Sequence, residues 1–232
     1  MSTKRRYEDG CAAAHGLDLV GERWAMLVVR ELLLGPKRFT DLRAGLAGIS
    51  PNVLTQRLEE LERNAIVQRR KLAPPAAAWV YELTEWGLQL EPVIKGLGRW
   101  AARSPFKPEA GLNVDSLILS FRTMFDASAA DGFSASVELR FGEDRFHARI
   151  DGGRMELDRG SADQPDVTIE TDSNTLAAVV YGGHKFADAL RSGDLRVEGD
   201  KSAAKRFVTL FPLPERAAAL EPAERSSPRG RR

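Results

Sequence analysis

The chain has very little cysteine, histidine or aromatic residue. Its 232 residues include one cysteine, Cys11, and three histidines, and only 7% are aromatic. A single cysteine excludes an internal disulfide framework and is typical of a reducing compartment. His15, His147 and His184 lie in unrelated contexts, and no Cys or His pair has the spacing of metal ligands. We therefore expect no metal, no cofactor and, without a set of nucleophile, base and orienting group, no enzymatic activity.

Long apolar runs are also absent. The most apolar stretch, residues 24–35, contains Arg30 and Glu31 and ends well short of the roughly 20 residues that a membrane span needs. The charged residues 1–10 are not followed by the apolar core of a secretory signal. We expect a cytoplasmic protein without a membrane partner.

The net charge of +1 hides an uneven distribution. Residues 1–105 hold sixteen Lys and Arg against twelve Asp and Glu, whereas residues 106–214 hold thirteen against eighteen. Such asymmetry indicates separate roles, with nucleic acid as the first partner to consider for the basic part.

The domain boundary is predicted at residues 104–111, SPFKPEAG, which lie between two long helical patterns. This gives domains at 1–105 and 106–214, followed by a disordered basic tail at 215–232, whose last twelve residues have almost no apolar content. The alternation of helical and strand patterns predicts the α+β class.

The first domain has the element order of a winged helix-turn-helix. Apolar spacing predicts helices over 17–35, 39–46, 50–63 and 85–103, with a β-hairpin over 67–83 before the last helix. Thr40 is the expected N-cap of the short second helix. The wide apolar face of 85–103 exceeds what one side of a small domain needs, which predicts a homodimer contact.

The helix at 50–63 occupies the recognition-helix position. Ser50 is a favoured N-cap and Pro51 suits the first helical position, while leucines form the buried stripe. Asn, Gln and Arg in its first turns can form paired hydrogen bonds with base edges of double-stranded DNA. Glutamates follow further along the axis, so we expect the helix to enter the groove by its N-terminus. The predicted DNA-contacting residues are Lys37, Arg38 and Thr40 around the short helix, Ser50, Pro51, Asn52, Thr55, Gln56 and Arg57 in the recognition helix, and Arg69, Arg70 and Lys71 in the wing.

Residues 11–103 resemble the HxlR family of bacterial winged-helix regulators. The stretches that carry the resemblance are GERW, RELLLGPKRFTDLR, GISPNVLTQRLEELE and YELTEWG. The resemblance implies a dimeric, nucleoid-associated transcription factor that binds palindromic operators, with a recognition helix at 50–63 and a wing at 67–83. We expect a repressor.

Cys11 lies where this family tends to have an N-terminal cysteine, which several members use to sense electrophiles or oxidants. His15, four residues on, would stabilise the thiolate if this segment is helical. The family's usual proline after the cysteine is Ala12 here. Cys11 therefore has two possible roles: it senses oxidants or electrophiles, or it is only a small residue packed at the edge of the dimer.

Residues 112–214 resemble the sterol carrier protein type two fold, most clearly in the stretch from PDVTIETD to KSAAKRFVTLF. The resemblance implies an α+β sterol-carrier-like domain with an apolar tunnel, and a small apolar ligand as a candidate partner that alters operator affinity. An alternative is an apolar-ligand or lipid binding protein whose helix-turn-helix does not function. The candidate ligand-lining residues are Phe121, Phe125, Phe141, Phe146, Val180, Phe186, Leu190, Phe207 and Phe211; each is also compatible with plain core packing.

Overall fold

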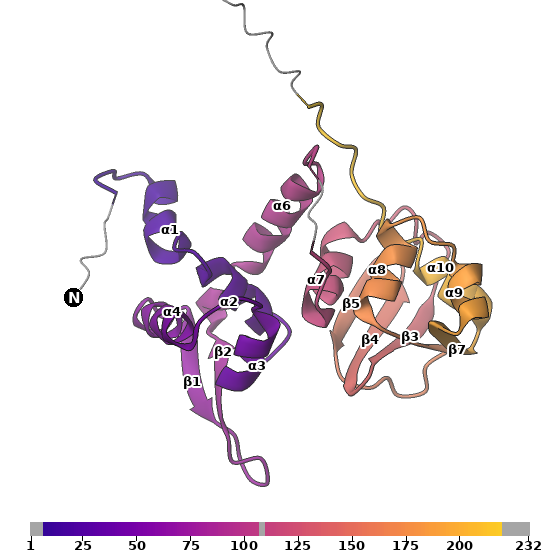
Figure 1. Cartoon of the computed structure of the whole chain (residues 1–232), viewed down its shortest axis with the longest axis horizontal. Coiled ribbons are helices and arrows are strands. Elements are labelled where there is room, and N and C mark those ends of the chain that lie inside the picture. Colours follow the sequence, from indigo (N-terminus) through magenta and orange to yellow (C-terminus); the bar gives the residue numbers. More distant parts are fainter. Residues whose placement is uncertain (1–6, 107–109, 220–232) are drawn as a thin grey trace, which may run out of the picture.

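The chain folds into two lobes with separate apolar cores (Figure 1). The computed structural model describes residues 7–106 and 110–219. The α+β class predicted from the sequence is confirmed. Leu34 of the first lobe packs into the core of the second, and Leu119 of the second packs into that of the first, so the two cores meet. Within the described ranges, no helix has the length and apolar character needed to cross a membrane.

The first lobe is helical apart from one two-stranded hairpin. Its elements are α1 (Ala12–Val20), α2 (Ala25–Leu32), α3 (Phe39–Gly45), α4 (Pro51–Arg63), β1 (Val67–Lys71), β2 (Trp79–Leu83), α5 (Glu85–Leu88) and α6 (Glu91–Ala102).

Two helices that were predicted as continuous are broken. The pattern at 17–35 is divided between α1 and α2 because Trp24 adopts a left-handed backbone with φ of 78°. The pattern at 85–103 is divided between α5 and α6, where Pro92 lies in the first turn of α6 and has no N–H with which to continue a preceding helix. Apolar spacing alone does not detect either break.

Helix α4 begins as the sequence predicts. The Val53 N–H donates to Ser50 Oγ at 3.3 Å, and Pro51 is the first helical residue. Leu54, Leu58 and Leu61 are buried against α2. The helix ends at Arg63, and its first turn is left facing outward because the leucines fix the opposite side.

The predicted hairpin at 67–83 is confirmed, with Arg69 opposite Tyr81 and Lys71 opposite Trp79. Lys37 forms an isolated antiparallel bridge to β2: its N–H donates to Tyr81 O at 3.0 Å, and the Tyr81 N–H donates to Lys37 O at 2.8 Å. The wing is therefore anchored to the segment between α2 and α3.

The second lobe is a five-stranded sheet with helices packed on one face. Its order is β5-β4-β3-β6-β7, and only the β3–β6 pair is parallel. Helix α7 begins this lobe and packs against α6 and α2 of the first lobe. The elements are α7 (Val114–Met124), β3 (Ala135–Phe141), β4 (Asp144–Asp151), β5 (Arg154–Arg159), β6 (Val167–Thr171), α8 (Ser173–Tyr181), α9 (Phe186–Ser192), β7 (Leu195–Gly199) and α10 (Lys201–Phe207).

Helix α7 ends at Met124 because Phe125 is extended, with ψ of 129°. Of the predicted disordered tail, residues 215–219 have no helix or strand, and 220–232 lie outside the described residues.

Candidate nucleic-acid interface

Helix α4 presents three polar side chains to solvent. Asn52, Thr55 and Gln56 are exposed, while Leu54 and Leu58 between and beyond them are fully buried. Gln56 donates to Glu60 Oε1 at 3.2 Å, an exposed bond that water or a base edge can replace at little cost. These three residues are therefore free to meet an external partner.

Arg57 is not among them, contrary to the prediction. Its residue exposure is 7%, and its guanidinium is paired with Glu60 and with Glu22 at 3.7 Å. The side chain points back from α4 toward the segment that joins α1 to α2. A buried, paired arginine stabilises the packing of the lobe and cannot reach a base without leaving its partners.

The three wing cations differ in their availability. The Arg69 guanidinium stacks over Trp79 at 4.6 Å and lies 5.9 Å from the Tyr81 ring centre. Arg70 is held in a bidentate pair with Glu82, with bonds of 2.9 and 2.7 Å, and this hydrogen bonding lowers the pKa of the Glu82 carboxyl. Lys71 is exposed. Arg69 and Lys71 are thus the wing cations best placed for phosphate.

Lys37 also differs from its predicted role. Its Nζ lies 2.5 Å from Glu31 Oε2 and also pairs with Asp115 of α7, so the ammonium is turned into the molecule. Burial raises the pKa of the Glu31 carboxyl, whereas Lys37 and Arg30 lower it. The lowering by the two cations is the larger effect, so the pKa lies below its ordinary value. Two carboxylates therefore hold the Lys37 ammonium inside the protein.

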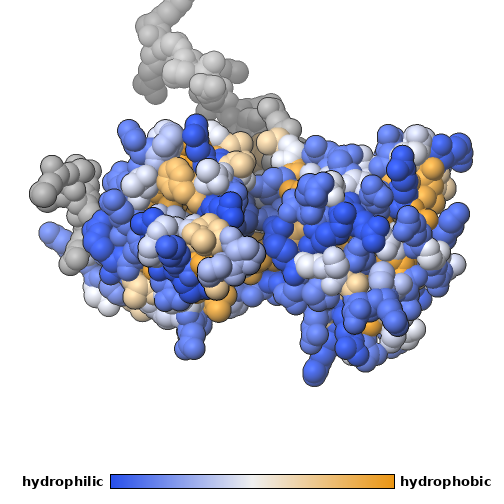
Figure 2. Space-filling model, turned by 90° about the horizontal axis from the view of Figure 1, so that it is seen from below, coloured by the Kyte–Doolittle hydropathy of each residue, from blue (hydrophilic) through white to orange (hydrophobic). Residues whose placement is uncertain are grey.

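The start of α3 keeps one predicted cation at the surface. Arg38 is exposed and is itself the N-cap residue, so Thr40 is not the cap that the sequence suggested. Asp41 in the first turn accepts the Arg38 N–H at 3.1 Å, and Thr40, exposed in the same turn, donates to Asp41 Oδ1 at 3.2 Å. Figure 2 views the molecule from the side toward which the wing projects, and this surface is largely hydrophilic.

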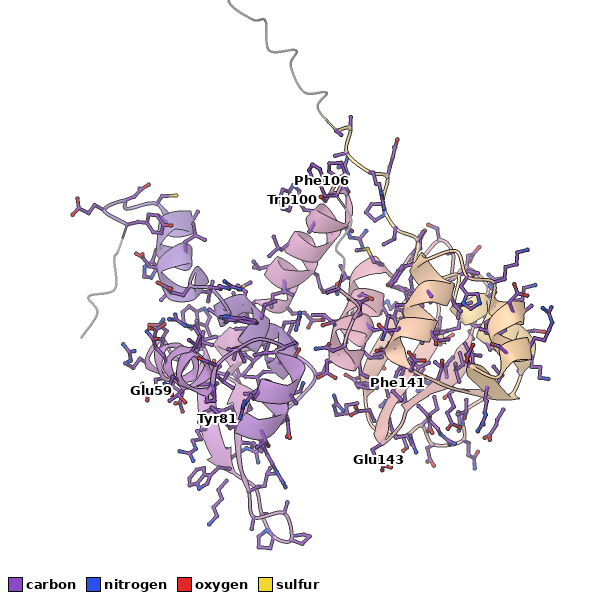
Figure 3. The ribbon with its side chains drawn as sticks, in the orientation of Figure 1. Glu59, Tyr81, Trp100, Phe106, Phe141 and Glu143 are labelled. Atoms are coloured by element: carbon purple, nitrogen blue, oxygen red, sulfur yellow. The ribbon has the colours of Figure 1, made fainter. Side chains whose placement is uncertain are left out.

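The opposite end of the first lobe is apolar. Helix α6 buries none of its twelve residues, and Val93, Leu97 and Trp100 are 54%, 52% and 73% exposed. Figure 3 places Trp100 with Phe106 at the end of α6, far from Glu59 of α4. Helix α1 likewise buries none of its residues and exposes Leu17. Val93, Leu97 and Trp100 are spaced at i, i+4 and i+7 and therefore form one exposed stripe along α6.

Cys11 lies at the N-terminus of α1 as its N-cap residue and is exposed. Hydrogen bonding to the backbone of Ala13 and Ala14 lowers the pKa of its thiol below the ordinary value. The segment is helical, as the hypothesis for His15 required, but the backbone amides rather than the imidazole account for the shift.

The nine candidate ligand-lining residues do not surround one tunnel. Phe121 stacks on Phe211 at 4.4 Å and meets Phe207 edge-on at 5.9 Å, so these rings form packed core. The fully or almost fully buried members are Phe121, Phe141, Phe146, Phe207 and Phe211, and the partly buried ones are Phe125, Val180, Phe186 and Leu190. Val180, Phe186 and Phe211 line a groove of about 270 Å³ beside Lys205 and Val208.

A cluster of charges between the lobes was not predicted from the sequence. Glu31 is fully buried and Asp115 is 6% exposed, and both bind Lys37. The only signal in the sequence was a glutamate within an apolar helix, because Asp115, the second carboxylate that Lys37 binds, lies on α7 in the other lobe.

Two protein-family models match consecutive parts of the chain. Residues 19–107 match the family model described as HxlR-like helix-turn-helix, and residues 110–217 match the one described as alkyl sulfatase C-terminal. The chain is 40% identical over 83 residues to the HTH-type transcriptional regulator YodB of Bacillus subtilis (strain 168), covering 36% of this chain and 74% of that protein.

A second relative is the uncharacterized HTH-type transcriptional regulator YvaP of the same organism. It is 35% identical over 85 residues, which cover 37% of this chain and 79% of that protein. Among solved structures, the reduced form of YodB aligns with a TM-score of 0.37 and 35% identity, covering 41% of this chain and 94% of that one.

Proposed function

The chain belongs to the HxlR-like helix-turn-helix family of transcriptional regulators, and on that basis we propose that it is a homodimeric repressor that reads operator DNA with α4 and the wing. The first turns of α4 enter the major groove, where Asn52 and Gln56 bond base edges and Thr55 contacts a base or phosphate. Arg38, Thr40, Arg69 and Lys71 contact phosphates, and Arg70 joins them only if it leaves Glu82.

The observation that carries this proposal is the exposed polar set on α4. Ser50 and Pro51 fix the start of the helix, and the buried leucines fix its rotation. Free N–H groups at the helix N-terminus add a site for phosphate. The cap is one that any helix can have, so the argument depends on the exposed side chains of Asn52 and Gln56, which can form paired hydrogen bonds with base edges.

The wing assignment has a direct test. Replacing Arg69 with alanine is expected to weaken binding to all DNA sequences alike, because a phosphate contact carries no sequence information. The slope of log affinity against log salt should fall by about one unit. Gel-shift titrations at several salt concentrations measure the slope. Glu85→Ala, an exposed change outside the wing, is the control, and a wild-type slope in Arg69→Ala would remove Arg69 from the interface.

The dimer rests on the exposed stripe of α6. Apolar side chains at Val93, Leu97 and Trp100 would be buried against the same helix of a second copy, with α1 beside them. Two α4 helices would then lie on one side of the dimer, as a palindromic operator requires.

The second lobe was expected to be sterol-carrier-like, but its family match is the alkyl sulfatase C-terminal model. We propose that it has a regulatory rather than an enzymatic role. The groove beside Val180, Phe186 and Phe211 would take a small apolar ligand, and the ligand would change operator affinity only if it bound the two states unequally. Native mass spectrometry of protein purified from cells tests this: the absence of any bound apolar molecule would count against the ligand.

A thiol switch at Cys11 is the alternative, favoured by the exposed thiol and its lowered pKa. Because a lower pKa means more thiolate at neutral pH, alkylation of Cys11 by iodoacetamide should reach half its maximal rate at a lower pH than for a free cysteine peptide. Cys11→Ser should abolish any loss of DNA binding caused by diamide. A diamide response that survives this substitution would exclude the switch.

A further inference from the structure

Lys37 contacts the wing through its backbone and the second lobe through its side chain. Its backbone forms both hydrogen bonds of a bridge to Tyr81 in wing strand β2, at 3.0 and 2.8 Å. Its side chain, 12% exposed, is paired with Glu31 of α2 and with Asp115 of α7. One residue thus joins the wing to the second lobe.

Asp115 is anchored in turn to the sheet of the second lobe. It pairs with Arg159 at the end of β5, and Arg159 also pairs with Asp144 of β4. The Arg159 guanidinium lies 4.5 Å from the ring centre of the buried Phe146, which fixes it over the sheet. Asn113, the N-cap of α7, donates to Gly45 O of α3 at 2.7 Å and ties the same junction to the first lobe.

The other end of this chain of contacts reaches a DNA-contacting candidate. Lys37 is hydrogen-bonded to the backbone of Tyr81, and the Tyr81 ring lies near the Arg69 guanidinium. Arg69 also stacks on Trp79, which lies on β2 with Tyr81. The contacts from β5 to Arg69 are therefore continuous, with Lys37 at the step between the lobes.

We propose that Lys37 is a positioning residue: bound to Asp115, it fixes strand β2 and Arg69 relative to the second lobe, so that the second lobe sets the position of the wing on DNA. The physical basis is the burial of the pair. Charges withdrawn from water are strongly destabilised when a partner is lost, so the pair favours one arrangement of the lobes. The proposal rests on the proposed function of the wing as a DNA contact.

Asp115→Asn tests the link while leaving Lys37 paired with Glu31 and Arg159 paired with Asp144. The matched control is Glu91→Gln, which breaks a different pair between the lobes, to Arg122 at 3.5 Å, with no contact to the wing. Arg159→Gln loosens the same link from its far end and should act in the same direction; it replaces Asp115→Asn if that variant does not fold.

Two measurements are made on the full chain. In hydrogen–deuterium exchange, residues 79–83 should exchange faster in Asp115→Asn and at the wild-type rate in Glu91→Gln. In a double-mutant cycle, Arg69→Ala should weaken DNA binding about tenfold in the wild-type and Glu91→Gln backgrounds, but only about twofold with Asp115→Asn.

A loss of affinity in Arg69→Ala that is the same in all backgrounds, or unchanged exchange in 79–83, would overturn the proposal. If Arg69→Ala has no effect even in the wild-type background, the wing contact of the proposed function fails. Exchange alone then decides whether Lys37 links the lobes: faster exchange in Asp115→Asn supports the link, and an unchanged rate refutes it.

Discussion

Replacing Leu97 with aspartate is expected to turn the dimer into monomers and to lower operator affinity by about two orders of magnitude. Leu97 lies in the middle of the exposed α6 stripe, between Val93 and Trp100, so in a dimer it would be buried against a second copy. An unpaired carboxylate at that position would be strongly unfavourable. A monomer binds only one half-site and loses the gain from two linked contacts.

Because Leu97 is 52% exposed within one chain, the same substitution should change the free energy of unfolding of the monomer little. Sedimentation velocity gives the oligomeric state, and gel shifts give the affinity. Ser161→Asp adds the same charge to an exposed site on the second lobe and should leave both unchanged. A dimer that persists in Leu97→Asp would show that α6 is not its interface.

The double substitution of Asn52 and Gln56 by alanine has the other large expected effect. Each paired bond to a base contributes about 1–3 kcal/mol of discrimination, so losing two should weaken specific binding by about a hundredfold or more. Both side chains are exposed, and the fold should keep its stability. The measurement is a gel shift with upstream DNA of the protein's own gene. Gln89→Ala, which changes an exposed glutamine at the end of α5, is the control. Unchanged specific binding in the double variant would contradict the assignment of α4.

Arg57 gives the matching contrast on the same helix. Its hydrogen bonds are internal, so Arg57→Ala should lower the free energy of unfolding by about 1–3 kcal/mol, since bonds between charged groups are lost. Urea unfolding measures this change. Reduced DNA affinity at wild-type stability would instead indicate that Arg57 leaves its pocket to reach DNA.

Local signals in the sequence predicted the parts of the interface that are determined locally. The Ser50 cap, Pro51 and the leucine row lie within one helix, and the hairpin follows from two β-prone runs joined by a short loop. The rotation of α4 follows from its apolar stripe, which is why the exposure of Asn52 and Gln56 could be inferred.

The remaining differences depend on partners that are distant in sequence. Lys37 and Arg57 were placed at the surface because basic residues usually lie there. Of the partners that bury them, Glu60 lies three residues from Arg57 on the same helix, a spacing that helical periodicity can report. Asp115 lies 78 residues from Lys37, and Glu22 lies outside α4, so no periodicity reports these two pairs. The phenylalanines of the second lobe have the spacing of either core or cavity lining, and only their contacts distinguish the two.

Footprinting of genomic DNA fragments that the purified protein selects tests the central claim, that α4 of a dimer reads base edges, most directly. We predict a small set of enriched fragments, each with two major-groove protections related by a dyad and about one helical turn apart. These protections should disappear for the Asn52 and Gln56 double alanine variant. Fragments bound without enrichment, or protection confined to the backbone and unchanged in that variant, would contradict the account.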